Sequence, residues 1–361
     1  MRDKTADRSA SLTAEGYLRQ ERKKNLVLIL LTVVLLAAAI ISLFIGSNDL
    51  RFSNFLSSAI PSLGEKLGAA PLTKIQSGIL WQLRLPRVLC AMVVGAVLAV
   101  CGTIMQATTG NIMASPYTTG ISSAAAFGAA IGILFQPLGS GGASTVVFAF
   151  AFGMVDAAVV YGITAATNLG AGGMILVGVA LNFLFSSANS LLQYIASDDK
   201  LSQIVHWSFG TLTGVTWMQI LVIAASFLVA MIVFMRLAWP LNVMSSGGDE
   251  SAKALGVDPN RVRVVSGVLV TIVAAITISF IGVIGFVGLV APHVARILIG
   301  SEHRKLLPGS MLLGALLVLI ADTIGRTIVA PTVIPVGVVL SVVGAPLFVY
   351  LILAQNRRRL Y

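Results

Sequence analysis

The chain has 361 residues, of which 57% are hydrophobic and only 11% charged, and its mean hydropathy is +0.94. A soluble domain usually has about 45–50% apolar and about 25% charged residues, so the composition excludes a soluble globule, a disordered chain and a coiled coil. The net charge of +10 does not indicate nucleic-acid binding, because Lys and Arg flank long apolar runs, as in integral membrane proteins.

Long apolar runs follow one another from residue 26 onward. The first, 26–45, is uncharged and lacks an A-x-A cleavage site, so we expect a retained helix rather than a signal peptide. The runs are continuous, not alternating, which favours helices over a barrel. The sequence therefore predicts an all-α membrane protein whose spans lie near 26–45, 88–107, 117–136, 144–164, 174–194, 217–235, 264–283, 285–299, 309–329 and 336–354.

The distribution of basic residues predicts the orientation. If the N-terminus is cytoplasmic, the inner segments hold 17 Lys and Arg and the outer segments 7, as the positive-inside rule requires. Both termini are then cytoplasmic. The expected organisation is a polar cytoplasmic segment at 1–25, a ten-helix membrane domain at 26–354 and a basic tail at 355–361.

The spans contain little that could perform catalysis. Their carboxylates are Asp156 and Asp322, and the three histidines are scattered, so neither an acid pair nor a metal-ligand cluster is indicated. The glycine-rich stretches lack the Gly-Lys-Ser/Thr of a phosphate loop. We expect no enzyme, no metal and no cofactor on this chain, and an ATPase on another chain if transport is pumped. His293, beside a proline, is interpreted as structural. Asp156 should face protein, be paired or be protonated, because a charge at membrane depth is costly. The small residues that flank it suit a hydrogen bond to a neighbouring backbone or hydroxyl group.

The longest inner loop, 240–263, carries helix start and stop signals. Its acidic pair at 249–250 suits a first turn, Gly256 suits a stop after Leu255, and Asp258 before a proline suits an N-cap. The pattern predicts two short helices at the cytoplasmic face. Two interpretations remain open, an amphipathic connector and a rigid knob that fits a cleft on a partner.

Arg84 and Arg87 stand where the outer loop enters the second predicted span, and Arg326 lies near the outer end of the ninth. Basic residues on this side run against the positive-inside rule and need another explanation. They can be interfacial arginines that extend toward the headgroups, or a docking surface for acidic groups of an extracytoplasmic partner. Asp322, four residues before Arg326 on the same helical face, can also simply pair with it.

The run 279–300 combines many glycines with a proline at membrane depth, which is tolerated only where protein or a cavity surrounds the backbone. Here the chain resembles the FecCD family, the permease subunits of type II ABC importers for ferric siderophores, haem and cobalamin. The resemblance covers about 80–350 and rests on Arg84–Arg87 with Gly95, Gly102 and Gln106, Asn111–Ser123, Leu176–Asn182, Trp207–Trp217, Gly248–Val257, Gly285–Arg296, His303–Pro308, Asp322–Arg326, Pro335–Gly337 and Gly344–Phe348.

The resemblance implies a homodimer, or a dimer with a closely related permease, with a pore at the dimer axis. It also implies two cytoplasmic ATPase subunits that bind ATP and Mg²⁺, and an extracytoplasmic binding protein. It implies an iron(III)-siderophore as cargo, with haem and cobalamin as alternatives. By the same resemblance, Arg84, Arg87 and Arg326 would meet carboxylates of the binding protein. The coupling segment that contacts the ATPase would include Gly248, Asp249, Glu250, Ala252, Leu255 and Gly256. The pore and its inner gate would include Ala171, Gly172 and Asn182.

The chain departs from the family pattern at two places. Asn111-Ile-Met-Ala114 replaces the usual Asn-Pro-Leu-Ala, which alters a turn, and Val333 replaces an outer Glu, which removes a carboxylate from the loop before the last span. Two other classes of protein fit the sequence less well. A secondary transporter would need a relay of intramembrane acids, and two isolated Asp residues make a poor one. A membrane scaffold is disfavoured by the glycines that suit a pore.

Overall fold

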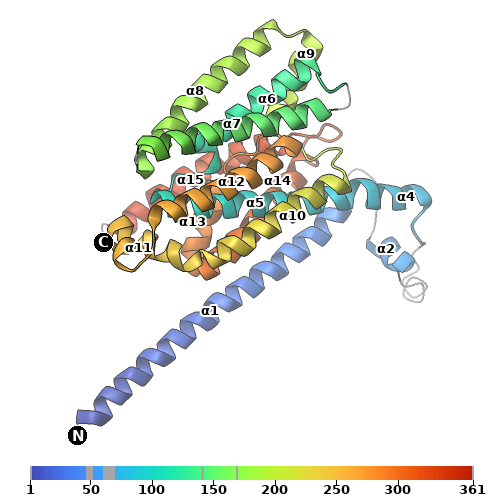
Figure 1. The fold of residues 1–361 in the computed structure, drawn as a ribbon. Coiled ribbons are helices and arrows are strands. Elements are labelled where there is room, and N and C mark those ends of the chain that lie inside the picture. Colours follow the sequence, from blue (N-terminus) through green and yellow to red (C-terminus); the bar gives the residue numbers. More distant parts are fainter. Residues whose placement is uncertain (1, 46–51, 60–69, 140–141, 168–169, 360–361) are drawn as a thin grey trace.

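The computed structural model describes residues 2–45, 52–59, 70–139, 142–167 and 170–359, and the regular structure within these residues is helical throughout (Figure 1). The elements are α1 (Arg2–Phe44), α2 (Phe52–Ala59), α4 (Lys74–Gly78), the π-helix η1 (Ile79–Arg84), α5 (Leu85–Thr109), the 3-10 helix η2 (Pro116–Thr119), α6 (Ile121–Phe135), α7 (Ala143–Thr167), α8 (Ala171–Ile195), α9 (Asp198–Ser208), α10 (Trp217–Arg236), α11 (Ala238–Ala254), α12 (Pro259–Ile281), α13 (Val287–Ile299), α14 (His303–Gly325) and α15 (Val336–Arg359).

The ten predicted spans are all present as helices in the described part of the chain. Seven helical stretches there are long and apolar enough to cross a membrane, in α1, α5, α7, α8, α10, α12 and α14. Three shorter apolar helices, in α6, α13 and α15, account for the other predicted runs. The all-α membrane fold is therefore confirmed.

Several predicted boundaries differ from the helix bounds by several residues. The largest difference is at the first span, because α1 begins at Arg2 and not at 26, and α15 continues to Arg359. The run 264–283 begins at Pro259, because Asp258 caps the helix by accepting from the Asn260 and Arg261 amides. The run 309–329 is helical over His303–Gly325. The run 117–136 begins with the 3-10 turn η2, and Gly120, with φ of 94°, breaks the chain direction before α6 starts.

The ends of the molecule agree with the predicted orientation. In Figure 1, α11, the N-terminus of α1 and the end of α15 lie toward one end of the bundle, and α2, α4 and α9 lie toward the other. Loop 240–263 thus shares an end with both termini, as the charge pattern predicts. We refer to this end as the inner end and to the opposite one as the outer end.

Helix α5 forms the centre of the bundle, where 83% of its most apolar window is buried. It packs against α12, α13 and α14, and two glycine pairs bring backbones together, Gly95 with Gly314 and Gly102 with Gly288. A Cβ atom on Gly95 would lie 2.6 Å from the carbonyl carbon of Gly314, too close for any real contact. Small residues that let backbones approach are the usual means of packing helices in a membrane, where the hydrophobic effect does not hold them together.

Gly95→Ala should therefore destabilise the protein. Overpacking a tight contact costs about 1–3 kcal/mol, and here the obstructing atoms belong to the backbone of Gly314, which cannot rotate away. The matched control is Gly162→Ala in α7, where an added Cβ would meet nothing within 4 Å. Thermal unfolding in detergent should show a lower Tm for Gly95→Ala than for Gly162→Ala. Equal Tm values would contradict the close-packing account of α5.

Candidate functional site

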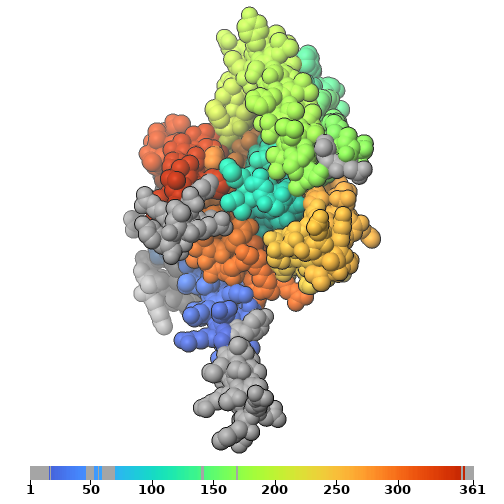
Figure 2. Space-filling view, turned by 90° about the vertical axis from the view of Figure 1, so that its left-hand side faces the viewer, coloured from blue at the N-terminus to red at the C-terminus, as the bar shows by residue number. Residues whose placement is uncertain are grey.

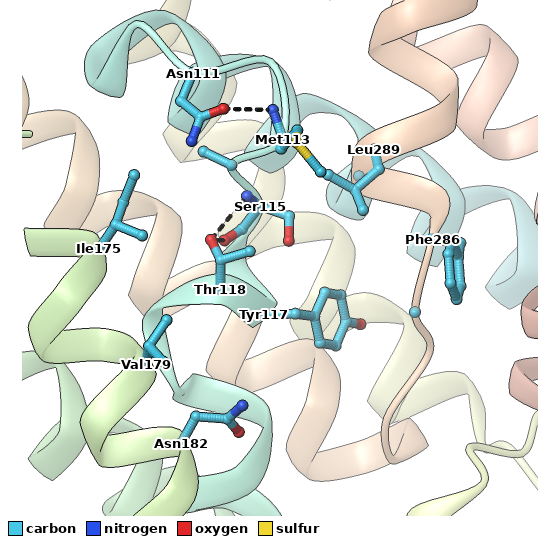
Figure 3. Close-up of a pocket in the computed structure, with 13 residues that line it drawn as sticks. Asn111, Met113, Ser115, Tyr117, Thr118, Ile175, Val179, Asn182, Phe286 and Leu289 are labelled. Atoms are coloured by element: carbon cyan, nitrogen blue, oxygen red, sulfur yellow. Dashed lines mark hydrogen bonds between the residues drawn. The ribbon is translucent and has the colours of Figure 1, made fainter. Parts of the chain in front are cut away.

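A pocket of about 520 Å³ opens between the loop after α5, the face of α8 and the segment before α13 (Figure 3). The polar groups that line it include the side-chain amides of Asn111 and Asn182 and the hydroxyls of Ser115 and Thr118. Most of the other residues that line it are apolar. Among the described residues that line it, none carries a formal charge. The lining suits a molecule without an exposed charge. It offers no carboxylate, imidazole or thiolate to a free metal ion.

The loop that forms one wall of this pocket keeps its turn despite Ile112. The Asn111 side-chain oxygen accepts from the Met113 amide at 2.9 Å, and the Asn111 carbonyl accepts from the Ala114 amide at 3.0 Å (Figure 3). An Asn that bonds the backbone two residues on makes a turn without proline. The departure at Ile112 therefore leaves the turn intact and exposes an apolar side chain, 45% of whose surface is accessible.

Of the three predicted pore residues, Asn182 lines the pocket, whereas Ala171 and Gly172 lie in the first turn of α8, away from it. Sequence reasoning missed Met113, Tyr117 and Phe286, which line it as well. The Tyr117 hydroxyl donates to the Ile284 carbonyl, which ties η2 to the irregular segment before α13. For Phe286 the available signal was the glycine-rich run at 279–300, which indicated backbone that is surrounded by protein or by a cavity.

A second pocket, of about 270 Å³, lies at the outer end and brings all three predicted arginines together (Figure 1 shows α4 at this end). Arg87 donates through Nε to both carboxylate oxygens of Asp322, at 2.8 and 3.1 Å, and its Nη2 lies 2.8 Å from Oδ1. The Asp322 side chain is fully buried. A bidentate, buried pair of this kind is strong and directional.

Arg326 and Arg84 are held mainly by backbone. Arg326 donates to the carbonyls of Ser42 and Ile45 at the end of α1, and its Nε lies 3.6 Å from Asp322. Arg84, 8% exposed, donates to the Leu43 carbonyl at 2.7 Å. The predicted pairing of Asp322 with Arg326 is confirmed, but Arg87 is the closer partner of Asp322. The arginines therefore line the outer pocket while fastening α1 and α14 to α5.

The loop between α14 and α15, in which Val333 stands where the family pattern has Glu, is held by a backbone hydrogen bond. Val333 lines the outer pocket, and the next residue, Ile334, donates its amide to the Gly325 carbonyl at 2.8 Å. This bond closes the turn between α14 and α15 without a carboxylate.

The cytoplasmic loop 240–263 has the predicted stop and cap signals, with one correction. Gly248, with φ of 70° and ψ of −175°, divides α11 into two helical pieces, and Gly256, with φ of 78°, ends the second. The piece that begins at Pro259 is not a short helix, because it continues as α12. At the tip, Leu255 is 61% exposed while Ala252 is fully buried. An apolar side chain thus projects from the segment Gly248–Gly256 at the inner end, which we call the α11 knob.

Asp156 lies in α7 with no exposed surface, and within the described residues neither of its carboxylate oxygens has a hydrogen-bond partner. The expected bond to a neighbouring backbone or hydroxyl group is therefore wrong for this structure. The carboxyl packs where α6, α7 and α8 meet. A Cβ on Gly120 would lie 2.7 Å from Oδ1 and 3.2 Å from the Gly178 carbonyl oxygen. An ionised carboxylate would have no compensating partner at this depth.

For the ATP-driven importer that the resemblance implies, Asp156→Asn should therefore retain uptake. The amide has nearly the same volume and cannot carry a charge, which the described surroundings would not compensate. The measurement is uptake by the reconstituted transporter, with folding and ATPase binding checked in the same preparation. Loss of uptake in a folded, ATPase-binding variant would instead indicate a proton-linked step.

Three comparisons with known proteins bear on this arrangement. The FecCD transport family model matches residues 34–354. The hemin transport system permease of Yersinia pestis is 39% identical over 77% of this chain and 84% of its own length. The molybdate import system permease of Haemophilus influenzae is 34% identical over 88% of this chain and 93% of its own length. An inward-facing structure of a metal-chelate type ABC transporter superposes with a TM-score of 0.80 and 33% identity, covering 91% of this chain and 99% of that chain.

Proposed function

The chain belongs to the FecCD transport family, and we propose that it carries a metal chelate across the cytoplasmic membrane. Its relatives in this family include permeases of import systems. The uncharged lining of the 520 Å³ pocket is the observation that supports this most. A chelate brings its own metal ligands and needs none from the pore. An oxyanion such as molybdate would be attracted by basic side chains, and a free cation by carboxylates or imidazoles; the described lining contains neither kind.

Among chelates, an iron(III)-siderophore is our first candidate, with haem and cobalamin as alternatives. The amide and hydroxyl groups of Asn111, Ser115, Thr118 and Asn182 suit weak, replaceable hydrogen bonds to the oxygen-rich surface of a siderophore. Tight binding would oppose passage, since conduction requires contacts that the cargo can leave. No cofactor on this chain is part of the proposal.

The proposed partners follow from the two ends of the molecule. A separate ATPase pair, loaded with ATP and Mg²⁺, would dock on the segment Gly248–Gly256, where Leu255 projects. An extracytoplasmic binding protein would dock over the pocket of Arg84, Arg87 and Arg326. A second copy of this chain would cover α8, whose most apolar window is only 6% buried and whose exposed side chains include Phe183 and Leu191. The two pockets of such a homodimer would then join at its axis.

The experiment is co-purification of the permease with its binding protein, followed by identification of the ligand that the binding protein retains. The isolated partner is then titrated with a ferric hydroxamate, haemin, cobalamin and molybdate. We expect the ferric chelate to bind most tightly and to support uptake. Preference for molybdate would contradict the chelate proposal, and preference for haemin or cobalamin would replace the siderophore within it.

A further inference from the structure

Arg263, in the second turn of α12, connects α12 with α11 and α5 through one buried side chain. Its side chain is 7% exposed. Nη2 donates to both carboxylate oxygens of Asp249 in α11, at 3.0 and 3.1 Å, and Nε donates to the carbonyl of Thr108 in α5, at 3.0 Å. Nη1 donates to Asn260 at 3.1 Å. The planar fork of a guanidinium holds these partners in a fixed relation that a lysine cannot reproduce.

The two partners outside α12 are Asp249 and Thr108. Asp249 belongs to the proposed ATPase-docking segment, and Thr108 lies at the end of α5 beside the pocket loop. Asp249 directly follows the break at Gly248 and leads into the helical piece that ends beside Leu255. Its side chain is 48% exposed, so it lies on the inner surface. Thr108 is in the last turn of α5, where carbonyl groups have no partner within the helix.

The end of α5 leads directly into the wall of the 520 Å³ pocket. Gly110, with φ of 62°, turns the chain out of the helix, and Asn111, Met113 and Ser115 then line the pocket. Figure 2, which faces the inner end, shows the orange-yellow segment of α11 and early α12 beside the turquoise segment that includes the end of α5. The Arg263 side chain therefore provides a hydrogen-bonded link between the knob and the end of α5, beside the direct packing of α11 on α5.

We propose that Arg263 is a positioning residue that transmits displacement of the α11 knob to the pocket-lining loop after α5. The inference rests on the proposed function, because the displacement would come from an ATPase docked on the knob. A movement of Asp249 pulls the guanidinium, and the guanidinium is bonded directly to the α5 carbonyl. The role is mechanical, and the residue touches neither cargo nor nucleotide.

The test uses a thiol at the pocket wall as the reporter. Met113→Cys places the reporter on a side chain that is 53% exposed, and both native cysteines, Cys90 and Cys101, have no exposed surface. The permease, assembled with its ATPase, is labelled with a charged maleimide without nucleotide and after trapping with ATP and vanadate. This readout needs no knowledge of the cargo.

In the Met113→Cys parent, trapping should change the labelling rate. Adding Arg263→Gln should reduce that change about fivefold or more, as expected for loss of a typical coupling between sites, while ATPase binding and ATP hydrolysis persist. Arg263→Lys should give an intermediate change, because an ammonium group cannot hold both partners. The matched control is Arg261→Gln, an exposed arginine of the same helix, which should behave as the parent.

Two results would overturn the inference. The first is an undiminished nucleotide response in Arg263→Gln. The second is loss of ATPase binding in that variant, which would make Arg263 a support of the docking knob rather than a transmitter. A parent that neither binds the ATPase nor responds to nucleotide would instead contradict the proposed function, and the inference with it.

Discussion

Leu255→Asp should abolish productive assembly of the permease with its ATPase while leaving the membrane domain folded. Leu255 is 61% exposed at the tip of the α11 knob, so the substitution disturbs no internal packing. In an apolar docking contact, however, it would bury an unpaired carboxylate, which costs several kcal/mol. We expect the affinity for the ATPase to fall by about 100-fold or more, which corresponds to about 2.7 kcal/mol.

The measurement is ATPase binding to the permease in detergent, followed by uptake in vesicles. Leu138→Asp is the matched control, because Leu138 is also exposed, at 57%, and lies in the loop after α6. It should bind the ATPase as the parent does. Unchanged affinity and transport in Leu255→Asp would contradict the role of the knob and favour the view that loop 240–263 is only a connector.

Arg84→Glu should weaken docking of the binding protein, and a Glu→Arg change on the binding protein should restore part of the affinity. Losing one close charge pair at an interface and adding repulsion costs about 2–5 kcal/mol, so we expect a loss of about 30-fold or more. Because Arg84 also donates to the Leu43 carbonyl, the variant should melt at a lower temperature. The partner substitution can rescue docking but not this loss of stability, so the two roles separate.

Lys74→Glu provides the control, since Lys74 is exposed at the same end and does not line the outer pocket. It should change docking little. Docking is measured at two salt concentrations, because steering by distant charges is lost at high salt while close pairs persist. A lower melting temperature without any change in docking would mean that the arginines only fasten α1 and α14 to α5.

The sequence predicted the helices well because each span must satisfy its own backbone, which forces long apolar runs. It could not predict how they pack, because nothing near Gly95 in the sequence indicates that its backbone contacts Gly314. The Arg87 pair with Asp322 is separated by 235 residues and left no periodic signal, whereas Asp322 and Arg326, four residues apart on one helix, could be paired from spacing alone.

Only part of the candidate site was predicted, because contacts between distant segments leave no pattern in the sequence. Asn182 was found through the family resemblance. Met113 and Phe286 were missed because they lie on irregular backbone, whose course depends on tertiary contacts such as Tyr117 with the Ile284 carbonyl. Arg263 could be read from sequence only as one basic residue of an inner loop. Its bond to Thr108, across the bundle, is what gives it a place in the mechanism that we propose.

The central claim, a permease driven by a separate ATPase, is tested most directly by reconstitution into vesicles. Permease alone and permease with the ATPase and binding protein are compared for accumulation of a radiolabelled ferric hydroxamate, with ATP inside or with an imposed proton or sodium gradient. We predict accumulation only with ATP and both partners, and none from either gradient. Accumulation by the permease alone under an ion gradient would contradict the account and make this chain a secondary transporter.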